Sequence, residues 1–148
     1  MEEGMSPEGL FESIKKETGL SGQDPALLSP LTLAFIGDSV FDTVIRTVIV
    51  SESETSPDKL NRRKNAIVNA GAQSELLKAI MQELSDEELL VVKRGRNAKP
   101  RSMAKNATVA EYHAATGFEA LIGYLYLKNE TERMLGLIMS GLKQTRPE

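Results

Sequence analysis

Residues 31–50 read LTLAFIGDSVFDTVIRTVIV, and this stretch decides the fold. Ser29 and Pro30 precede it and provide an N-cap residue followed by proline at the first helical position. The apolar side chains of residues 31–50 wrap most of the way around a helix, which predicts a mostly buried helix. Its β-branched end, residues 43–50, would by itself also suit a strand, but the length of the run and the cap favour a helix.

Every strong local signal outside this stretch is also helical. Caps or capping boxes begin helices at Ser56-Pro57, at Ser85 with Glu88, and at Thr108 with Glu111. The sequence therefore predicts an all-α domain. Its further helices are expected over residues 7–17, 57–84 (bent or broken at Gly71), 85–92, 108–127 and 131–142.

Composition bounds the class of protein. The chain has 148 residues, which is enough for one domain with its own core and too few for two. Its apolar runs are interrupted well before bilayer length, and its first residues, MEEG, do not resemble a signal peptide. The absence of cysteine excludes disulfides, thiol nucleophiles and thiolate metal sites. We therefore expect a cytoplasmic protein without a membrane segment.

The charge is unevenly distributed along the chain. The net charge is −3, yet residues 1–24 carry six acidic residues against two lysines, a net of −4, which leaves +1 for the remainder. Residues 93–105 hold six basic residues and no acidic one. The low overall pI therefore hides a local cationic segment, and phosphates respond to local fields.

Two acidic residues interrupt apolar stretches. Asp38 follows Gly37 in the middle of the 31–50 helix. An interior glycine costs about 1 kcal/mol relative to alanine, and an unpaired buried carboxylate costs several more. Glu119 stands within a second apolar run, and Gly123 one turn further suggests the close approach of another backbone. Both acids therefore need a structural or chemical reason.

Either acid alone could simply satisfy a neighbouring helix or Arg46. Two such acids on glycine-bearing apolar helices are better explained together, as ligands that converge on one hard cation. Oxygen ligands of this kind suit Mg²⁺, which keeps several of its waters. Such an ion can activate water and stabilise charge on a phosphodiester. Asp42 lies one turn after Asp38 and shares its face of the helix.

Two motifs resemble those of a known family. Residues 33–40, LAFIGDSV, resemble the signature helix of ribonuclease III, and residues 118–127, FEALIGYLYL, resemble its second acidic motif. The chain is more similar to the Mini-III branch, which consists of the ribonuclease III catalytic domain without the double-stranded-RNA-binding domain. Residues 95–99, GRNAK, and Lys105-Asn106 also resemble that branch. The resemblance covers about residues 28–142.

The resemblance implies a fold like the helical bundle of the ribonuclease III endonuclease domain over residues 28–148, after an acidic extension with a short helix over residues 1–27. It implies a homodimer that hydrolyses double-stranded RNA with Mg²⁺, for which Mn²⁺ can substitute, and that leaves short 3′ overhangs. Asp38 and Glu119 match the metal-binding, catalytic acids of the family. The implied substrate is the precursor of large-subunit (23S) ribosomal RNA, trimmed near its paired ends. No double-stranded-RNA-binding domain is expected after Glu148.

Two positions depart from the pattern of the larger enzymes of the family. Ala34 stands where they carry a glutamate, four residues before the signature aspartate. Thr116 stands where they carry an aspartate, three residues before the second glutamate. Mini-III proteins also lack these two acids, but their absence leaves open how many metal ions the site binds. Thr116 could orient a water molecule bound to the metal, and Asp42 could interact with the metal ligands without binding the metal itself.

Two other functions fit parts of the sequence. The first is a non-catalytic dimeric RNA-binding protein with a ribonuclease III-like fold, which the missing acids at Ala34 and Thr116 favour. The retention of Asp38 and Glu119 disfavours it, because a pure binder gains nothing from acids that face phosphates. The second is a helical scaffold unrelated to RNA. It predicts no binding to duplex RNA and no effect of Mg²⁺ on thermal stability.

The basic loop expected over residues 95–106 is the candidate RNA-binding element. Its cations, with those just before it, could contact phosphates and give salt-dependent affinity, although a solvated charged loop has the same composition. The candidate RNA-binding residues are Lys93, Arg94, Arg96, Lys99, Arg101 and Lys105. A second basic cluster lies within residues 59–64, and a solvent-facing helix side would explain it equally well.

His113 is the single histidine of the chain. Histidine can act as a general base near neutral pH, but metal-dependent phosphodiester hydrolysis does not require one. A position on a helix surface or at an interface is the alternative.

A second copy of the chain is expected to cover part of the 31–50 helix. This helix is too apolar on too many sides for one small helical domain to bury, and a symmetric contact through it would cover the excess. Phe35 matches the aromatic residue that inserts into the partner in the larger family members. Two symmetric sites would cut both strands of a duplex.

Overall fold

The structure is a computed structural model that describes residues 9–52, 55–99 and 108–146. Within these ranges the secondary structure is helical, without a strand, which confirms the predicted all-α fold. The elements are α1 (Leu10–Thr18), the 3-10 helix η1 (Pro25–Leu27), α2 (Pro30–Glu52), α3 (Pro57–Val68), α4 (Ala70–Ile80), the 3-10 helix η2 (Met81–Glu83), α5 (Asp86–Arg96), α6 (Val109–Leu127) and α7 (Thr131–Thr145).

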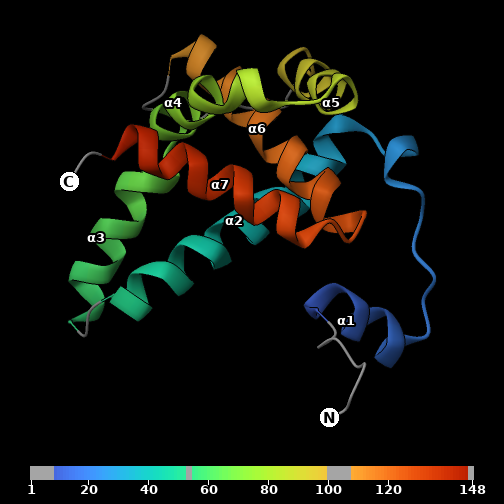
Figure 1. Cartoon of the computed structure of the whole chain (residues 1–148), viewed down its shortest axis with the longest axis horizontal. Helices are drawn as coiled ribbons and strands as arrows, with labels where there is room; N and C mark the ends of the chain where they lie inside the picture. Colours follow the sequence, from blue (N-terminus) through green and yellow to red (C-terminus); the bar gives the residue numbers. More distant parts are fainter. Residues whose placement is uncertain (1–8, 53–54, 100–107, 147–148) are drawn as a thin grey trace.

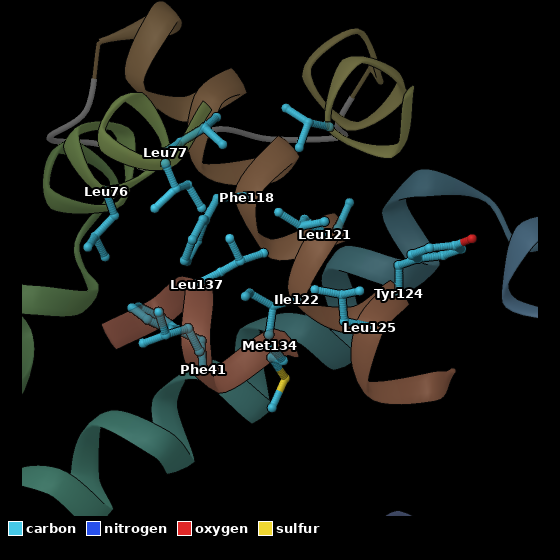
Figure 2. Close-up of a cluster of buried hydrophobic side chains, with 14 of the residues drawn as sticks. Phe41, Leu76, Leu77, Phe118, Leu121, Ile122, Tyr124, Leu125, Met134 and Leu137 are labelled. Atoms are coloured by element: carbon cyan, nitrogen blue, oxygen red, sulfur yellow. The ribbon is translucent and has the colours of Figure 1, made fainter. Parts of the chain in front are cut away.

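Helix α6 forms the centre of the bundle and packs against α2, α4, α5 and α7 (Figure 1). It is apolar on nearly every side, so burial among other helices is its only favourable environment. Figure 2 shows its side chains interleaved with those of α2, α4 and α7. The rings of Phe41 and Phe118 meet edge to face, with their centroids 5.0 Å apart.

Helix α2 buries one face in the single chain. Its buried residues recur every four positions from Leu33 through Gly37, Phe41 and Ile45 to Ile49, which places them along one side of the helix. Other apolar residues of α2 face outward, and the exposed fraction of Phe35 is 79%. The prediction of a mostly buried helix is therefore wrong for the chain by itself, because α6 and its neighbours reach only one side of α2.

The crossing of α2 and α6 is very close at two glycines. A Cβ atom added to Gly37 would overlap the backbone oxygen of Glu119, and one added to Gly123 would overlap the backbone oxygen of Leu33. Since each helix offers a glycine to the backbone of the other, the two axes can approach further than any side chain would permit. This confirms the close approach predicted at Gly123.

The break between α3 and α4 falls at Asn69, so the prediction of a break at Gly71 is wrong. The side-chain oxygen of Asn69 accepts a hydrogen bond from the backbone N–H of Ala72 at 2.8 Å and caps α4. Its side-chain amide donates to the backbone oxygens of Asn65, at 2.9 Å, and Ala66, at 3.3 Å, and so satisfies the end of α3. One asparagine therefore ends one helix and begins the next.

The capping boxes at Ser85 and Thr108 are both present, but the helix that begins after Ser85 runs to Arg96. The prediction of a loop from Gly95 onward is therefore wrong at its beginning. Gly95 is buried because α5 crosses α6 there, and a Cβ at Gly95 would lie 2.8 Å from the Cα of Gly117. Tertiary packing thus retains a glycine that local preference places outside the helix.

Helix α1 lies at the edge of the bundle, at the end of a long extended segment (Figure 1). Its Phe11 ring meets the ring of Tyr126, at the end of α6, with a centroid distance of 5.3 Å. The ammonium group of Lys15 lies over the Phe11 ring, 5.1 Å from its centroid. The short helix predicted in the acidic extension is therefore present and touches the domain through one aromatic pair.

An ion pair between a buried carboxylate and a half-exposed arginine ties α5 to α7. Arg133 donates from Nε to Glu88 Oε2 at 2.9 Å and from Nη2 to Glu88 Oε1 at 2.7 Å. Its Nη2 also donates to the backbone oxygen of Glu83 at 2.7 Å. The side chain of Glu88 is only 7% exposed, and the Arg133 guanidinium, which outweighs the effect of burial, lowers its pKa.

We expect Arg133→Met to destabilise the fold by about 2 kcal/mol at pH 7, because it removes the cationic partner of a buried carboxylate and leaves it only the capping bond from the Ser85 backbone N–H. The folded-state pKa of Glu88 is lowered, so the pair contributes fully above the ordinary pKa of 4.5 and is lost as pH falls through the lower folded value. Urea unfolding of both proteins between pH 7 and pH 3 measures this. The difference should shrink with acidity; a difference that is constant with pH would contradict the assignment.

Candidate active site

An open hollow lies between α2 and the first half of α6, with about 620 Å³ of space, which is within the usual range for ligand sites. Both predicted catalytic acids, Asp38 and Glu119, line it. So do Ala34 and Thr116, the two positions that lack the acids of the larger enzymes. Its full lining is Leu31, Ala34, Phe35, Ile36, Asp38, Ser39, Asp42, Tyr112, Thr116 and Glu119.

The helix crossing at Gly37 holds Asp38 and Glu119 together. Because the backbones of α2 and α6 touch at Gly37 and Glu119, the residue after Gly37 projects beside the Glu119 side chain. The two carboxyl groups interact by charge and by a hydrogen bond between their side chains. Asp38 is exposed and Glu119 is half-buried. The expectation of two buried acids is therefore wrong for Asp38, which lies on the rim of the hollow.

The environment strongly favours the protonated form of Glu119. Burial, the negative charge of Asp38 and the hydrogen bond between the two side chains raise the pKa of Glu119 to about 8, while a hydrogen bond from Gln73 opposes the shift. The protein by itself therefore does not stabilise two adjacent negative charges at this site. A cation between the carboxylates would remove that penalty.

Gln73, on α4, is a residue of the site that the sequence analysis did not identify. It is 2% exposed, and its Nε2 donates to the backbone oxygen of Val68 at 2.8 Å and to Glu119 Oε2 at 3.2 Å. Its Oε1 is buried and has no hydrogen-bond partner. The signal was present, because Gln73 occupies the same helix face as the buried Leu76 and Leu77. A polar residue on such a face needs a partner.

Thr116 and Asp42 both reach the hollow but make different contacts. Thr116 is buried, and its hydroxyl donates to the backbone oxygen of Tyr112 at 3.0 Å, so its oxygen lone pairs remain available to a donor. Asp42 lies one turn beyond Asp38 and pairs with Arg46 at 2.6 Å and with Lys64 at 3.9 Å. The suggested roles of Thr116 and Asp42 at a metal site stay predictions.

The described residues contain no group of three or more histidine, aspartate or glutamate side chains arranged to hold a metal ion. The candidate donors are therefore the two interacting carboxyl groups, Asp38 and Glu119. Two carboxylates nevertheless suffice for Mg²⁺, which retains most of its waters and is often held by one or two protein carboxylates.

The predicted RNA-binding cations fall in two groups. Lys93, Arg94 and Arg96 lie in the last turns of α5, and Lys99 follows it; all four side chains are exposed. The aliphatic part of Arg96 lies against Gly117, next to Thr116 of the hollow. Arg101 and Lys105 lie outside the described residues. The structure therefore places the basic end of α5 beside the N-terminal half of α6.

His113 and Phe35, which the sequence also singled out, differ in their position relative to the hollow. His113 does not line the hollow, and its half-buried ring has an Nδ1 atom without a hydrogen-bond partner. This position gives no support to a general-base role. Phe35 lines the hollow and is 79% exposed, as a residue that contacts a second copy would be before assembly.

A helical domain with paired carboxylates on two crossing helices matches a known family of nucleases. The model of the ribonuclease III domain matches residues 31–130, which include both acidic motifs. The chain therefore belongs to the ribonuclease III family, whose activity is that of an endoribonuclease.

The chain is similar in sequence to several Mini-ribonuclease 3 proteins. The protein from Brevibacillus brevis is 46% identical over 78% of this chain and 87% of its own length. The protein from a Thermoanaerobacter species is 47% identical over 86% of this chain and 85% of its own. A crystal structure of a Fusobacterium nucleatum protein superposes with a TM-score of 0.75 and 33% identity, covering 83% of this chain and 98% of that one.

Of the helices in the described ranges, none has the length and apolar character needed to cross a membrane.

Proposed function

We propose that this protein is a Mg²⁺-dependent endoribonuclease that cuts double-stranded RNA as a homodimer in the cytoplasm, and that it matures the ends of the precursor of 23S ribosomal RNA. The observation that carries the catalytic part is the pairing of Asp38 and Glu119 in one open hollow, where the pKa of Glu119 is raised to about 8. The ribosomal substrate rests on the similarity to Mini-ribonuclease 3 proteins.

The residues of the hollow fit a divalent cation. Asp38 and Glu119 would hold Mg²⁺ or Mn²⁺, which when bound activates water and stabilises the charge on the cleaved phosphodiester. Gln73 donates to one oxygen of Glu119 and so fixes the orientation of that carboxylate. Thr116 offers a hydroxyl oxygen one turn before Glu119, where it can accept a hydrogen bond from water and orient it.

The direct test is incubation with long duplex RNA, with and without Mg²⁺ or Mn²⁺, beside matched single-stranded RNA. We expect cutting of the duplex only, and only with a divalent cation. A protein that binds duplex RNA but leaves it intact with either cation would instead support the alternative of a non-catalytic dimeric RNA-binding protein.

The exposed apolar residues at the beginning of α2 support the homodimer. Leu27, in η1, is 80% exposed, and Phe35, the sixth residue of α2, is 79% exposed. Leu31, between them, is 39% exposed. A symmetric contact would bury this strip twice and would place two hollows on one assembly, one for each strand of a duplex.

We expect Phe35→Asp to convert a dimer into a monomer. A central aromatic residue contributes about 2 kcal/mol or more to an interface, and it counts twice in a symmetric dimer, so the dissociation constant should rise about a thousandfold. Sedimentation equilibrium measures it, with Leu90→Asp as the control because Leu90 is 58% exposed on α5 and does not line the hollow. An unchanged dimer in Phe35→Asp would exclude Phe35 from the interface.

A further inference from the structure

We propose that Arg46, on the same face of α2 as Asp38, and Lys64, on α3, form a second binding site for RNA phosphate. The proposal rests on the proposed action on duplex RNA. It adds a contact for the backbone of the substrate away from the phosphodiester that is cut.

Arg46 lies on the face of α2 that leads from the first hollow to a second one. Asp38, Asp42 and Arg46 are spaced four residues apart, so they lie along one face of α2. Asp38 and Asp42 line the hollow that holds Glu119, whereas Arg46 lines a second hollow of about 400 Å³ between the end of α2 and α3. At 1.5 Å of rise per residue, Arg46 lies about 12 Å along the axis from Asp38. A polyanion that runs along this face of α2 would therefore pass both hollows.

The second hollow lies where α2 ends beside the beginning of α3 (Figure 1). Its polar lining includes Arg46 and Lys64, with Asn61 as a further donor and Asp58 in the first turn of α3, where the helix dipole stabilises a carboxylate. The rest of the wall is apolar and consists of Ile49, Val50, Pro57 and Leu60.

Arg46 and Lys64 bring positive charge to the second hollow. Arg46 and Lys64 share one carboxylate, Asp42, so the three side chains carry a net charge of +1. Arg46 holds Asp42 at 2.6 Å, whereas the Lys64 ammonium is 3.9 Å away, which exceeds hydrogen-bond distance. The Lys64 side chain is only 14% exposed, so it is held toward α2 and the hollow rather than spread into solvent. The Lys64 ammonium group therefore makes no hydrogen bond to Asp42.

The structural role of these contacts is small. An ion pair four residues apart on a helix surface, such as Asp42 with Arg46, adds little to the stability of the fold. By contrast, a phosphate group bound here would contact two cations that are already in position. Its neutralisation would also release condensed counterions, which favours binding. A bound phosphate would therefore compete with the Asp42 carboxylate for Arg46 and Lys64.

The test measures binding of duplex RNA by fluorescence anisotropy, in EDTA and over a series of KCl concentrations, so that no cutting occurs. The variants are Arg46→Gln, Lys64→Gln and the double variant. Lys78→Gln is the matched control, because Lys78 is also an ion-paired helical lysine, with Glu75 at 3.4 Å, and lines neither hollow.

We expect the double variant to bind about tenfold more weakly at low salt and to reduce the slope of log affinity against log salt by about 1 to 2. The charge-conserving variants Arg46→Lys and Lys64→Arg should keep both affinity and slope. Asp42→Asn should bind more tightly, since it releases the cations from their internal anion. Lys78→Gln should match the wild type.

Unchanged affinity and slope in the double variant would overturn the proposal. So would a loss of affinity that the charge-conserving variants share, because that would follow from altered packing rather than from charge. The outcome is separable from the proposed activity. If the wild type binds duplex RNA through these residues but never cuts it, the nuclease assignment fails and the phosphate site stands; if it cuts but binds without them, only the phosphate site fails.

Discussion

Asp38→Asn and Glu119→Gln are each expected to reduce cleavage of duplex RNA by more than about a hundredfold while leaving RNA binding in EDTA intact. Changing even the residues that hydrogen-bond to metal ligands lowers metal affinity or activity 10–100-fold. Asp38 and Glu119 are the two interacting carboxyl groups of the hollow, whereas its third carboxylate, Asp42, is paired with Arg46. Single-turnover cleavage of a duplex with Mg²⁺ measures the effect. Cutting at the wild-type rate by either variant would remove that carboxylate from the mechanism.

The same variants should alter the response of stability to pH and metal. The folded-state pKa of Glu119 is raised from 4.5 to about 8, so the unfolded chain releases its proton first. This group therefore lowers stability progressively as pH rises from about 4.5 to about 8 in the absence of metal. We expect Glu119→Gln to remove this decline, and we expect Mg²⁺ to raise the melting temperature of the wild type at pH 8 but not that of Glu119→Gln.

Both readouts are needed because they separate the possible functions. A helical scaffold unrelated to RNA would show no effect of Mg²⁺ on the melting temperature. A binding protein without turnover could still bind the cation, and so could show the thermal effect without cleavage. Circular dichroism of both variants provides the control for folding.

Gly37→Ala is expected to produce the second large effect. The new Cβ would overlap the backbone oxygen of Glu119 and would lie 2.7 Å from the backbone nitrogen of Gly123. Backbone atoms cannot rotate away as a flexible side chain can, so α2 and α6 must separate. We expect a loss of about 3 kcal/mol of stability, or about 10 °C in melting temperature. A displacement of about 1 Å between Asp38 and Glu119, the proposed catalytic acids, should also reduce cleavage about a hundredfold.

Gly136→Ala is the matched control for this substitution. Gly136 is also an interior helical glycine, but a Cβ there would have no atom within 4 Å. Alanine should therefore stabilise α7 by about 0.5–1 kcal/mol. Thermal unfolding and single-turnover cleavage of both variants decide the question. If Gly37→Ala matched Gly136→Ala in both assays, the close crossing of α2 and α6 would not be what positions the acids.

Most of the fold could be predicted because its signals are local. The cap at Ser56 and the capping boxes at Ser85 and Thr108 satisfy backbone groups within three residues, so neighbouring residues suffice to place these helix beginnings. The prediction was wrong where a distant partner intervenes. Gly95 stays helical because α6 offers Gly117 opposite it, and a local pattern contains no information about that contact.

The sequence singled out the two acids of the candidate site but not the residues that surround them. Asp38 and Glu119 stood out because carboxylates are costly in apolar stretches, and the motifs around them resembled one family. Gln73 was missed because glutamine is common on helix surfaces, and only the fold shows that it is buried beside Glu119. The orientation of Lys64 toward Asp42 was equally invisible in a run of basic residues.

The sequence by itself determined that this protein is all-helical, that Asp38 and Glu119 are its unusual acids, and that the motifs around them resemble ribonuclease III. These properties depend on capping, on apolar periodicity and on the desolvation cost of a carboxylate, all of which act over a few residues. Only the tertiary structure decided that the two acids share one hollow. That pairing depends on two helices crossing at Gly37 and Gly123 closely enough for their backbones to touch, which long-range packing determines and local sequence does not.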